Sequence, residues 1–189
     1  MIVIVGITGA SGAIYGIRTL EALSKMKDIE THLIISENGE KIIRHETSYE
    51  PDDLRKLATV CHDIDEIGAS ISSGSFRRDA MVVAPCSIKT MSALANSYTE
   101  NLIVRAGDVT LKERKPLVLL VRETPFHYGH LQSMVRLTQM GATILPPVPS
   151  FYHKPQTIDD IVNHTVARAL DLMGIKHDLS KRWRGDMTE

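Results

Sequence analysis

Glycines and hydroxyl side chains gather at two points of the sequence where an apolar segment gives way to a helical pattern. The first is residues 6–16, with glycines at positions 6, 9, 12 and 16. The second is residues 85–90, where Ser87 and Thr90 can cap a helix. A helix N-terminus carries unpaired N–H groups and a partial positive charge, so it attracts anions. The two turns together predict a site for one phosphorylated, ring-bearing ligand, although ordinary capping explains the second turn equally well.

The first turn matches neither of two common phosphate-binding fingerprints. Its spacing differs from the G-x-G-x-x-G of dinucleotide-binding proteins, and no glycine-lysine pair follows as in a P-loop. The alternative is a tight turn whose glycines serve only close packing. The turn by itself leaves both interpretations open.

Polar side chains also follow two other apolar segments. Arg122 and Glu123 come directly after residues 117–121, and Ser36 follows residues 30–35. Ligands of open α/β sheets bind at the carboxyl ends of the strands, and charges are depleted near buried strands. We therefore expect these three side chains to contact a ligand, with an ion pair between the two charges and a simple turn at the serine as alternatives.

These candidates need a scaffold of alternating strands and helices. Apolar, β-branched runs predict strands at residues 2–7, 30–35, 80–84, 117–121 and 142–145, with Pro85 ending the third. Helical patterns lie at residues 13–26, 41–46, 53–58, 102–112, 127–140 and 157–173. Strict alternation predicts an α/β fold with a doubly wound parallel sheet. Without a repeat or linker, residues 1–189 are expected to form one domain with a tail from about residue 175.

Composition excludes several classes of protein. With 22 basic and 23 acidic residues the net charge is −1, which argues against wholesale binding to nucleic acid or an anionic membrane. Two cysteines without a C-x-x-C pair indicate neither a disulfide scaffold nor a zinc site. The N-terminal apolar run is too short for a signal sequence or a membrane span. A cytoplasmic enzyme is expected.

Six motifs in order resemble the UbiX family of flavin prenyltransferases, over nearly the whole chain. They are Thr8-Gly9-Ala10-Ser11-Gly12-Ala13, Ser72-Ser73-Gly74-Ser75-Phe76, Pro85-Cys86-Ser87-Ile88-Lys89-Thr90, Asp108-Val109-Thr110-Leu111-Lys112-Glu113, Val121-Arg122-Glu123-Thr124-Pro125 and Pro146-Pro147-Val148-Pro149-Ser150-Phe151-Tyr152. The resemblance implies a Rossmann-like, flavodoxin-type flavoprotein domain assembled into a homododecamer. It also implies transfer of a dimethylallyl group from dimethylallyl phosphate to N5 and C6 of reduced FMN. The prenylated FMN would pass to a UbiD-type decarboxylase.

The resemblance also assigns roles to residues, and the sequence departs from the family pattern at none of these positions. For FMN binding it implies Gly9, Ala10, Ser11, Ser36, Ser87, Ile88, Lys89, Thr90 and Arg122. For the prenyl phosphate it implies Tyr152, Arg168, Arg105 and Lys112. For catalysis it implies Ser11, Glu46, Glu123, Lys112 and Trp183. By its helical pattern alone, Glu46 indicates only a solvated charge.

The residue types suit prenyl transfer without a metal ion. No D-D-x-x-D motif is present to hold magnesium on a diphosphate, so the arginines, Lys112 and Tyr152 would stabilise the leaving phosphate. Glu123 would share a proton with that phosphate, and Trp183 would face the allyl cation. Ser11 and Glu46 would carry protons at the flavin, and burial near an apolar ring should raise the pKa of Glu46.

Two other functions remain open at this point. An FMN-dependent cysteine decarboxylase of related fold would use a histidine and an asparagine-bearing motif, but residues 85–90 occupy the place where that motif is expected. A non-catalytic FMN carrier for a decarboxylase would bind flavin and leave the cationic residues without a purpose.

Overall fold

The computed structural model describes residues 1–180, which alternate between strands and helices. The strands are β1 (Ile2–Ile7), β2 (Glu30–Ile35), β3 (Val60–His62), β4 (Ala80–Cys86), β5 (Leu117–Val121) and β6 (Thr143–Ile144). The helices are α1 (Ala13–Ser24), α2 (Glu37–Glu46), α3 (Pro51–Leu57), α4 (Ile88–Ala95), α5 (Leu102–Lys112), α6 (Tyr128–Met140) and α7 (Ile158–Leu172), with a 3-10 turn η1 at Ser70–Ser72.

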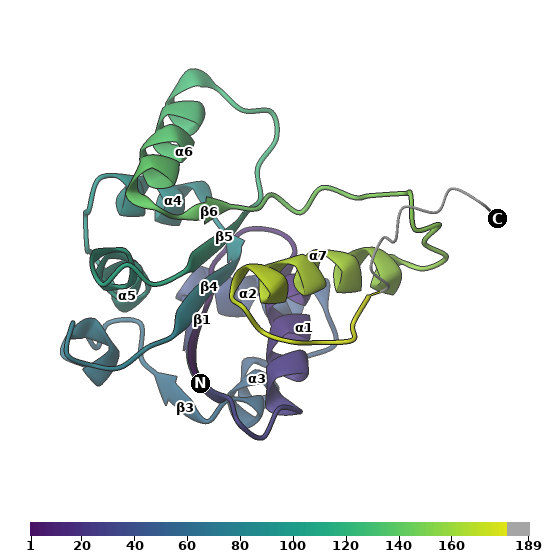
Figure 1. The fold of residues 1–189 in the computed structure, drawn as a ribbon, viewed down its shortest axis with the longest axis horizontal. Helices are drawn as coiled ribbons and strands as arrows, with labels where there is room; N and C mark the ends of the chain where they lie inside the picture. The colour runs from purple at the N-terminus through teal and green to yellow at the C-terminus, as the bar shows by residue number, and fades with distance from the viewer. Residues whose placement is uncertain (181–189) are drawn as a thin grey trace.

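All six strands pair in parallel in one sheet, in the order β3-β2-β1-β4-β5-β6. The chain builds outward from β1 to β3, then returns to place β4 on the other side of β1 (Figure 1). The predicted doubly wound α/β fold is therefore confirmed. The strand order reverses between β1 and β4, and open sheets of this kind bind ligands beside that reversal, at the carboxyl ends of the strands.

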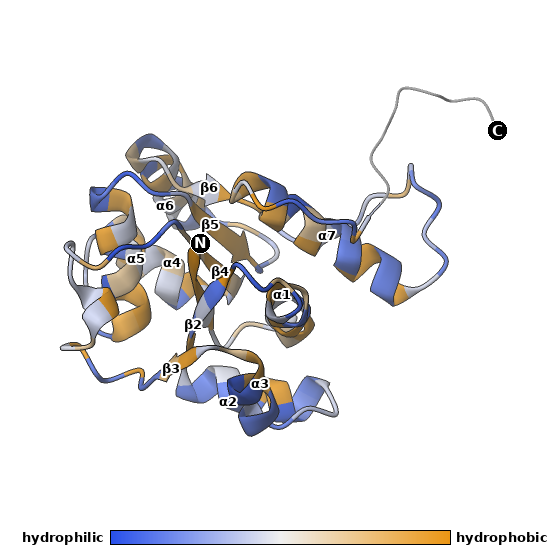
Figure 2. Ribbon diagram, turned by 60° about the horizontal axis from the view of Figure 1, so that its bottom comes forward, coloured by the Kyte–Doolittle hydropathy of each residue, from blue (hydrophilic) through white to orange (hydrophobic). Residues whose placement is uncertain are grey.

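Helices cover both faces of the sheet because successive strand residues point to opposite sides. Val3 and Val5 of β1 pack into a buried cluster with α1 and α7, whereas Ile4 belongs to a second cluster with α4 and α5. Figure 2 shows the hydrophobic strands at the centre, with the polar residues mainly on the outer helix faces. Both faces are thus buried, as the wholly apolar strand segments predicted.

The structure differs from the predicted strands at two places. A sixth strand, β3, pairs with β2 at the sheet edge, where Val60 lies opposite His32. Three residues are too few to show a periodic pattern. Pro85 does not end β4, which continues to Cys86 with a shift in register after Val83. Such irregularities tolerate a proline that cannot donate a ladder hydrogen bond.

The segment that joins β6 to α7 extends away from the sheet (Figure 1). We call residues 146–157 the arm. Two of its large apolar side chains, Val148 and Phe151, are each 70% exposed. The helices among residues 1–180 are all too short or too polar to cross a membrane.

Candidate functional site

Thr8 ties the loop after β1 to the loop after β4. Its hydroxyl donates to the carbonyl oxygen of Pro85 at 2.7 Å and accepts the N–H of Ser87 at 2.8 Å. The threonine side chain is buried, and the bond to Pro85 is shielded from water, whereas the bond from Ser87 is partly buried. These bonds fix the start of α4 beside the glycine turn, at the point where the strand order reverses.

Two backbone hydrogen bonds connect the ends of β2 and β5 to these two loops. The N–H of Ser36 donates to the carbonyl of Ile7 at 3.0 Å, and the N–H of Arg122 donates to the carbonyl of Cys86 at 3.1 Å. The loops after β1, β2, β4 and β5 therefore form one connected carboxyl edge. This edge brings together the serines and the arginine that the sequence singled out.

A cavity of about 380 Å³ opens at this edge, between the starts of α2 and α4. Its lining residues are Thr8, Gly9, Ser36, Glu37, Asn38, Ile64, Asp65, Ser87, Lys89, Thr90, Glu100 and Asn101. Ser36 accepts the N–H of Gly39 at 3.1 Å, and Ser87 accepts the N–H of Thr90 at 3.3 Å. The predicted helix capping by Ser87 is confirmed, and each capping hydroxyl lies at the cavity.

The donors around this cavity are mainly neutral. Its one lysine, Lys89, lies 3.1 Å from a carboxylate oxygen of Glu100, and Glu37 and Asp65 add further negative charge. A phosphate ester would therefore be held by hydroxyls and N–H groups at two helix N-termini rather than by free cations. That set of donors fits the phosphate of FMN. Of the residues predicted to bind FMN, those that line the cavity are Gly9, Ser36, Ser87, Lys89 and Thr90. Ala10, Ser11, Ile88 and Arg122 belong to the same loops but do not line the cavity.

Glu46 occupies the N-terminus of α1. One carboxylate oxygen accepts the N–H of Gly12 at 2.8 Å and the N–H of Ala13 at 3.1 Å. Burial favours a raised pKa for Glu46, but hydrogen bonds from Ser11, Gly12 and Ala13, with the charge of Arg122, hold the pKa below its ordinary value. The expected raised pKa is wrong, because a carboxylate that accepts several hydrogen bonds is favoured in its charged form.

The anion bound at this helix start is thus the protein's own carboxylate. Gly12 is the N-cap and has a left-handed φ of 97°, which suits glycine. A Cβ atom at Gly9 would lie 2.4 Å from Cβ of Asn38 on α2. The missing side chain at Gly9 therefore lets α2 pack closely, whatever Gly9 contributes to ligand binding.

The charged pair after β5 is not an ion pair. Within residues 1–180, Arg122 forms no salt bridge, and a carboxylate oxygen of Glu123 accepts the N–H of Thr124 at 2.9 Å. Arg122 is exposed, and its positive charge acts on Glu46. The structure therefore brings Ser11, Glu46 and Arg122 together near the cavity.

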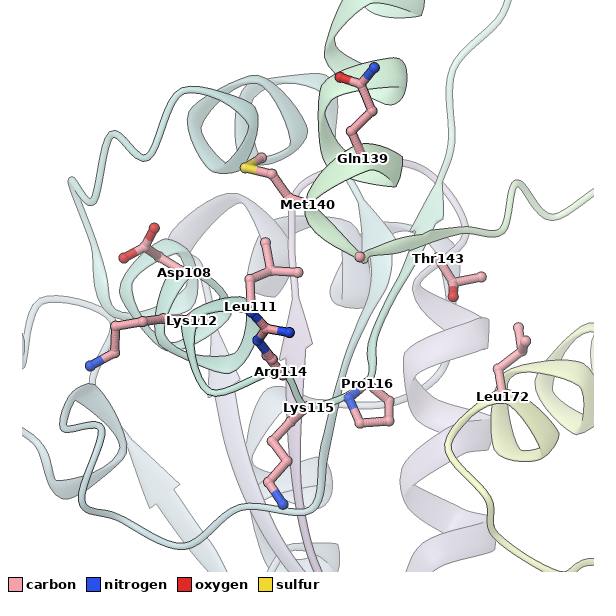
Figure 3. A pocket seen from close by; sticks show the side chains of 11 residues that line it. Asp108, Leu111, Lys112, Arg114, Lys115, Pro116, Gln139, Met140, Thr143 and Leu172 are labelled. Carbon is pink, nitrogen blue, oxygen red and sulfur yellow. The ribbon is translucent and has the colours of Figure 1, made fainter.

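Arg105 and Lys112 lie elsewhere, on α5. Nε of Arg105 donates to the carbonyl of Ser72 at 3.1 Å, and Nζ of Lys112 lies 3.1 Å from a carboxylate oxygen of Glu113. Lys112 lines a larger cavity of about 880 Å³ together with Pro116, the residue before β5 (Figure 3). Arg122 follows the same strand, whose five residues span about 17 Å. Lys112 thus lies at the amino edge of the sheet, opposite Arg122.

The larger cavity is not our candidate site, despite its size. It lies at the amino ends of the strands, and of the predicted site residues it contains only Lys112 among those that the structure describes. Exposed lysine and arginine side chains form much of its wall, as Figure 3 shows for Lys112, Arg114 and Lys115. The smaller cavity has the position and the donors that the chemistry needs.

Tyr152 and Arg168 form a third group, on the arm and α7. The hydroxyl of Tyr152 lies 2.7 Å from Nε2 of His164, and Arg168 follows one helical turn after that histidine. Nη1 of Arg168 lies 2.9 Å from a carboxylate oxygen of Asp171. Neither Tyr152 nor Arg168 lines the carboxyl-edge cavity. Trp183 lies outside the described residues.

Sequence reasoning missed Thr8 and His164 as site residues. A hydroxyl directly after a strand was the signal that identified Ser36, and the same signal was present at Thr8. His164 carried no such signal, because its contact with Tyr152 depends on how the arm folds over α7.

Comparison with known proteins gives one consistent family. The flavoprotein family model matches residues 1–170. A flavin prenyltransferase UbiX from Thauera aromatica is 54% identical over 186 residues, covering 98% of this chain and 95% of the relative. A crystal structure of AnUbiX (PadA1) in complex with FMN and dimethylallyl pyrophosphate has a TM-score of 0.95 at 45% identity, with 97% of each chain covered. A dodecameric FMN-dependent UbiX-like decarboxylase from Escherichia coli O157:H7 has a TM-score of 0.96 at 46% identity, covering 98% of this chain and 100% of the other.

Proposed function

The chain belongs to the UbiX flavin prenyltransferases of the flavoprotein family, and we propose how its residues join a dimethylallyl group to reduced FMN. The observation that carries the assignment is identity over nearly the full length, together with a carboxyl-edge cavity whose donors fit FMN. A structure of a 45% identical protein contains FMN and dimethylallyl pyrophosphate, which supports this pair of substrates. Reduced FMN would supply the nucleophilic atoms N5 and C6. Dimethylallyl phosphate is the proposed donor.

The FMN phosphate and ribityl chain are assigned to the carboxyl-edge cavity. Ser36, Ser87 and Thr90 offer hydroxyls beside the N-termini of α2 and α4, where phosphate is favoured. Gly9, Ala10, Ser11, Ile88 and Lys89 belong to the same two loops, and Arg122 approaches from β5. We place the flavin ring towards Ser11 and Glu46, outside the cavity that holds the phosphate.

Glu46 acts in this proposal as a proton acceptor. Its lowered pKa keeps the carboxylate ionised at neutral pH, and the Ser11 hydroxyl donates to it. A proton that leaves the flavin edge can therefore pass to the Ser11 oxygen while the Ser11 proton moves to the carboxylate. The glutamate is held for this task by the N–H groups of Gly12 and Ala13.

The prenyl phosphate is assigned to residues that one chain does not bring together. Lys112 and Arg105 lie on α5, Tyr152 and Arg168 on the arm side of α7, and Glu123 after β5. We propose that each site is completed by α5 of another copy of the chain. A 46% identical relative is dodecameric, and the exposed apolar side chains of the arm suit burial against a neighbour. The assembled cations would stabilise the departing phosphate.

Subunit complementation tests this shared site. Lys112→Ala and Glu46→Gln chains are purified separately, then dissociated and reassembled as an equal mixture. Each parent should be inactive when reduced FMN and dimethylallyl phosphate are incubated without oxygen and the mass gain of the flavin is measured. Random mixing should restore roughly one quarter of the sites, because an intact site then needs one chain of each kind.

The matched control mixes Lys112→Ala with Arg105→Ala. Both residues lie on α5, so each site takes both of them from a single chain. Every chain in this mixture lacks one of the two, and the mixture should stay inactive. Absence of recovery in the first mixture would show that Glu46 and Lys112 act within one chain. Absence of a mass gain with the unaltered protein would instead refute the prenyl transfer itself.

Simple assays distinguish the two alternative functions from prenyl transfer. A cysteine decarboxylase would consume a peptidyl-cysteine substrate, and a flavin carrier would bind FMN without changing its mass.

We further propose a UbiD-type decarboxylase as the recipient of prenylated FMN and the cytoplasm as the location. Glu123 as a proton partner of the phosphate, Trp183 at the allyl group and independence from magnesium also stay predictions.

A further inference from the structure

Four polar residues of the arm and α7 form a continuous chain of hydrogen-bonding contacts. The hydroxyl oxygen of Ser150 lies 3.3 Å from Nδ1 of His153 and 3.2 Å from Nδ1 of His164. The other ring nitrogen of His164, Nε2, lies 2.7 Å from the hydroxyl of Tyr152. The two imidazoles stack with centroids 4.5 Å apart and an angle of 5° between their planes. Tyr152 thus belongs to a built polar network.

The contacts have a direction in which each hydrogen between His153 and Tyr152 finds an acceptor. A tyrosine hydroxyl has one hydrogen, so it can donate to a phosphate only when its bond to His164 is an accepted one. Nε2 of His164 must then carry the hydrogen, which makes Nδ1 an acceptor for Ser150. Ser150 in turn accepts from Nδ1 of His153. In this direction the Tyr152 hydrogen points away from His164.

The far end of the chain agrees with this direction. Nε2 of His153 would carry no hydrogen, and it is buried with no hydrogen-bond partner among residues 1–180. Burial and the nearby positive charge of Arg168 lower the pKa of His164, which favours the neutral ring that the chain needs. Arg168 lies four residues after His164 and hence on the same face of α7.

We propose that His164 is a positioning residue that, through Ser150 and His153, presents the Tyr152 hydroxyl hydrogen to the phosphate of the prenyl donor beside Arg168. The inference rests on the proposed role of Tyr152 in binding that phosphate. His164 itself does not touch the substrate. Because Nε2 of His164 donates its hydrogen, the tyrosine hydroxyl does not donate to the imidazole. Otherwise a lone pair of the tyrosine oxygen would face the anion.

A double-mutant cycle tests the coupling between the two residues. Tyr152→Phe, His164→Leu and the double variant are compared as assembled enzymes, with reduced FMN saturating and dimethylallyl phosphate varied. Tyr152→Phe should raise KM for the prenyl phosphate about tenfold, since one hydrogen bond to a charged group is lost. His164→Leu should raise KM by a similar or smaller factor, with little change in kcat. The double variant should be no worse than Tyr152→Phe.

Rescue and control variants separate positioning from a merely structural effect. His164→Gln places an amide N–H near the position of Nε2 and should recover part of the lost affinity. Tyr128→Phe removes an exposed tyrosine hydroxyl on α6, and in that background His164→Leu should keep its full effect. The dissociation constant for FMN should not change in any of these variants.

Two results would overturn the inference. One is a His164→Leu effect that multiplies undiminished onto Tyr152→Phe, and the other is a His164→Gln variant as impaired as the leucine variant. An unchanged KM in Tyr152→Phe would instead refute the proposed phosphate contact of the tyrosine. These failures are distinguishable because the single tyrosine variant is measured on its own.

Discussion

Replacing Thr8 with valine tests whether the two central loops of the site are held together by one hydroxyl. Valine has nearly the same shape, so the substitution removes hydrogen bonds without opening a cavity. The lost bonds are the one to the Pro85 carbonyl at 2.7 Å and the one from the Ser87 N–H at 2.8 Å. The first bond is buried and the second is partly buried.

The expected loss in the free energy of unfolding depends on which hydrogen bonds each partner keeps in the variant. The partly buried Ser87 N–H loses its acceptor, and leaving such a group unsatisfied costs at most about 1–3 kcal/mol. The Pro85 carbonyl still accepts the backbone N–H of Thr8 at 3.3 Å, so its loss is that of an ordinary hydrogen bond, roughly 0.5–1.5 kcal/mol. Together these losses are roughly 1.5–4.5 kcal/mol, which for a chain of this size lowers the thermal midpoint by roughly 3–18 °C.

The assay is denaturant unfolding at one fixed protein concentration, because an oligomer's stability depends on concentration. Thr19→Val is the matched control. Thr19 is equally buried, but its hydroxyl donates to the Tyr15 carbonyl, which as part of α1 already accepts a helix hydrogen bond. The control should therefore cost less than about 1 kcal/mol. Thr8→Ser keeps the hydroxyl and should recover most of the loss.

Equal costs for Thr8→Val and Thr19→Val would refute the reasoning, because the strand-end bonds would then be no more valuable than a redundant helix bond. A Thr8→Ser variant as unstable as Thr8→Val would also refute it, since the hydroxyl would not be the cause.

Two further predictions concern the same edge of the sheet. Gly9→Ala should destabilise the protein by about 1–3 kcal/mol, because the new Cβ meets Cβ of Asn38 at 2.4 Å, whereas Gly68→Ala, with open space around it, should be near neutral in the same unfolding assay; equal effects would contradict the packing role. Glu46→Gln should lower stability at neutral pH, and its difference from the unaltered protein should shrink as pH falls through the pKa of Glu46, since a carboxyl whose folded pKa is lowered stabilises only while it is ionised. Unfolding measured between about pH 7 and pH 3 checks this, and a difference that stays constant or grows towards acid would contradict the lowered pKa.

The sequence predicted the architecture well because both faces of the sheet are buried. Wholly apolar strands such as Leu117–Val121 stand out from their neighbours without any knowledge of their partners. The short edge strand Val60–His62 gave no such signal, and it exists because β2 offers it a free edge. Helix ends with side-chain caps, such as Ser87 before α4, were also predictable because capping is local.

The resemblance assigned the candidate site residues, but tertiary structure decided how they are grouped. Ser11, Glu46 and Arg122 come together because parallel strands end at one edge. Lys112 cannot join them within a chain, because the length of β5 separates the two edges. This separation follows from chain order, because Lys112 precedes β5 and Arg122 follows it.

The sequence by itself determined which residue types could hold a flavin and a prenyl phosphate and on which elements they lie. Tertiary structure alone decided the charge state and partners of those groups. Glu46 was expected to have a raised pKa near an apolar ring, yet three hydrogen-bond donors at the start of α1 lower it. The proposed direction of the Tyr152 hydroxyl likewise depends on its contact with His164. Local patterns fix backbone conformation, whereas pKa and hydrogen-bond direction depend on side chains that meet only after the chain has folded.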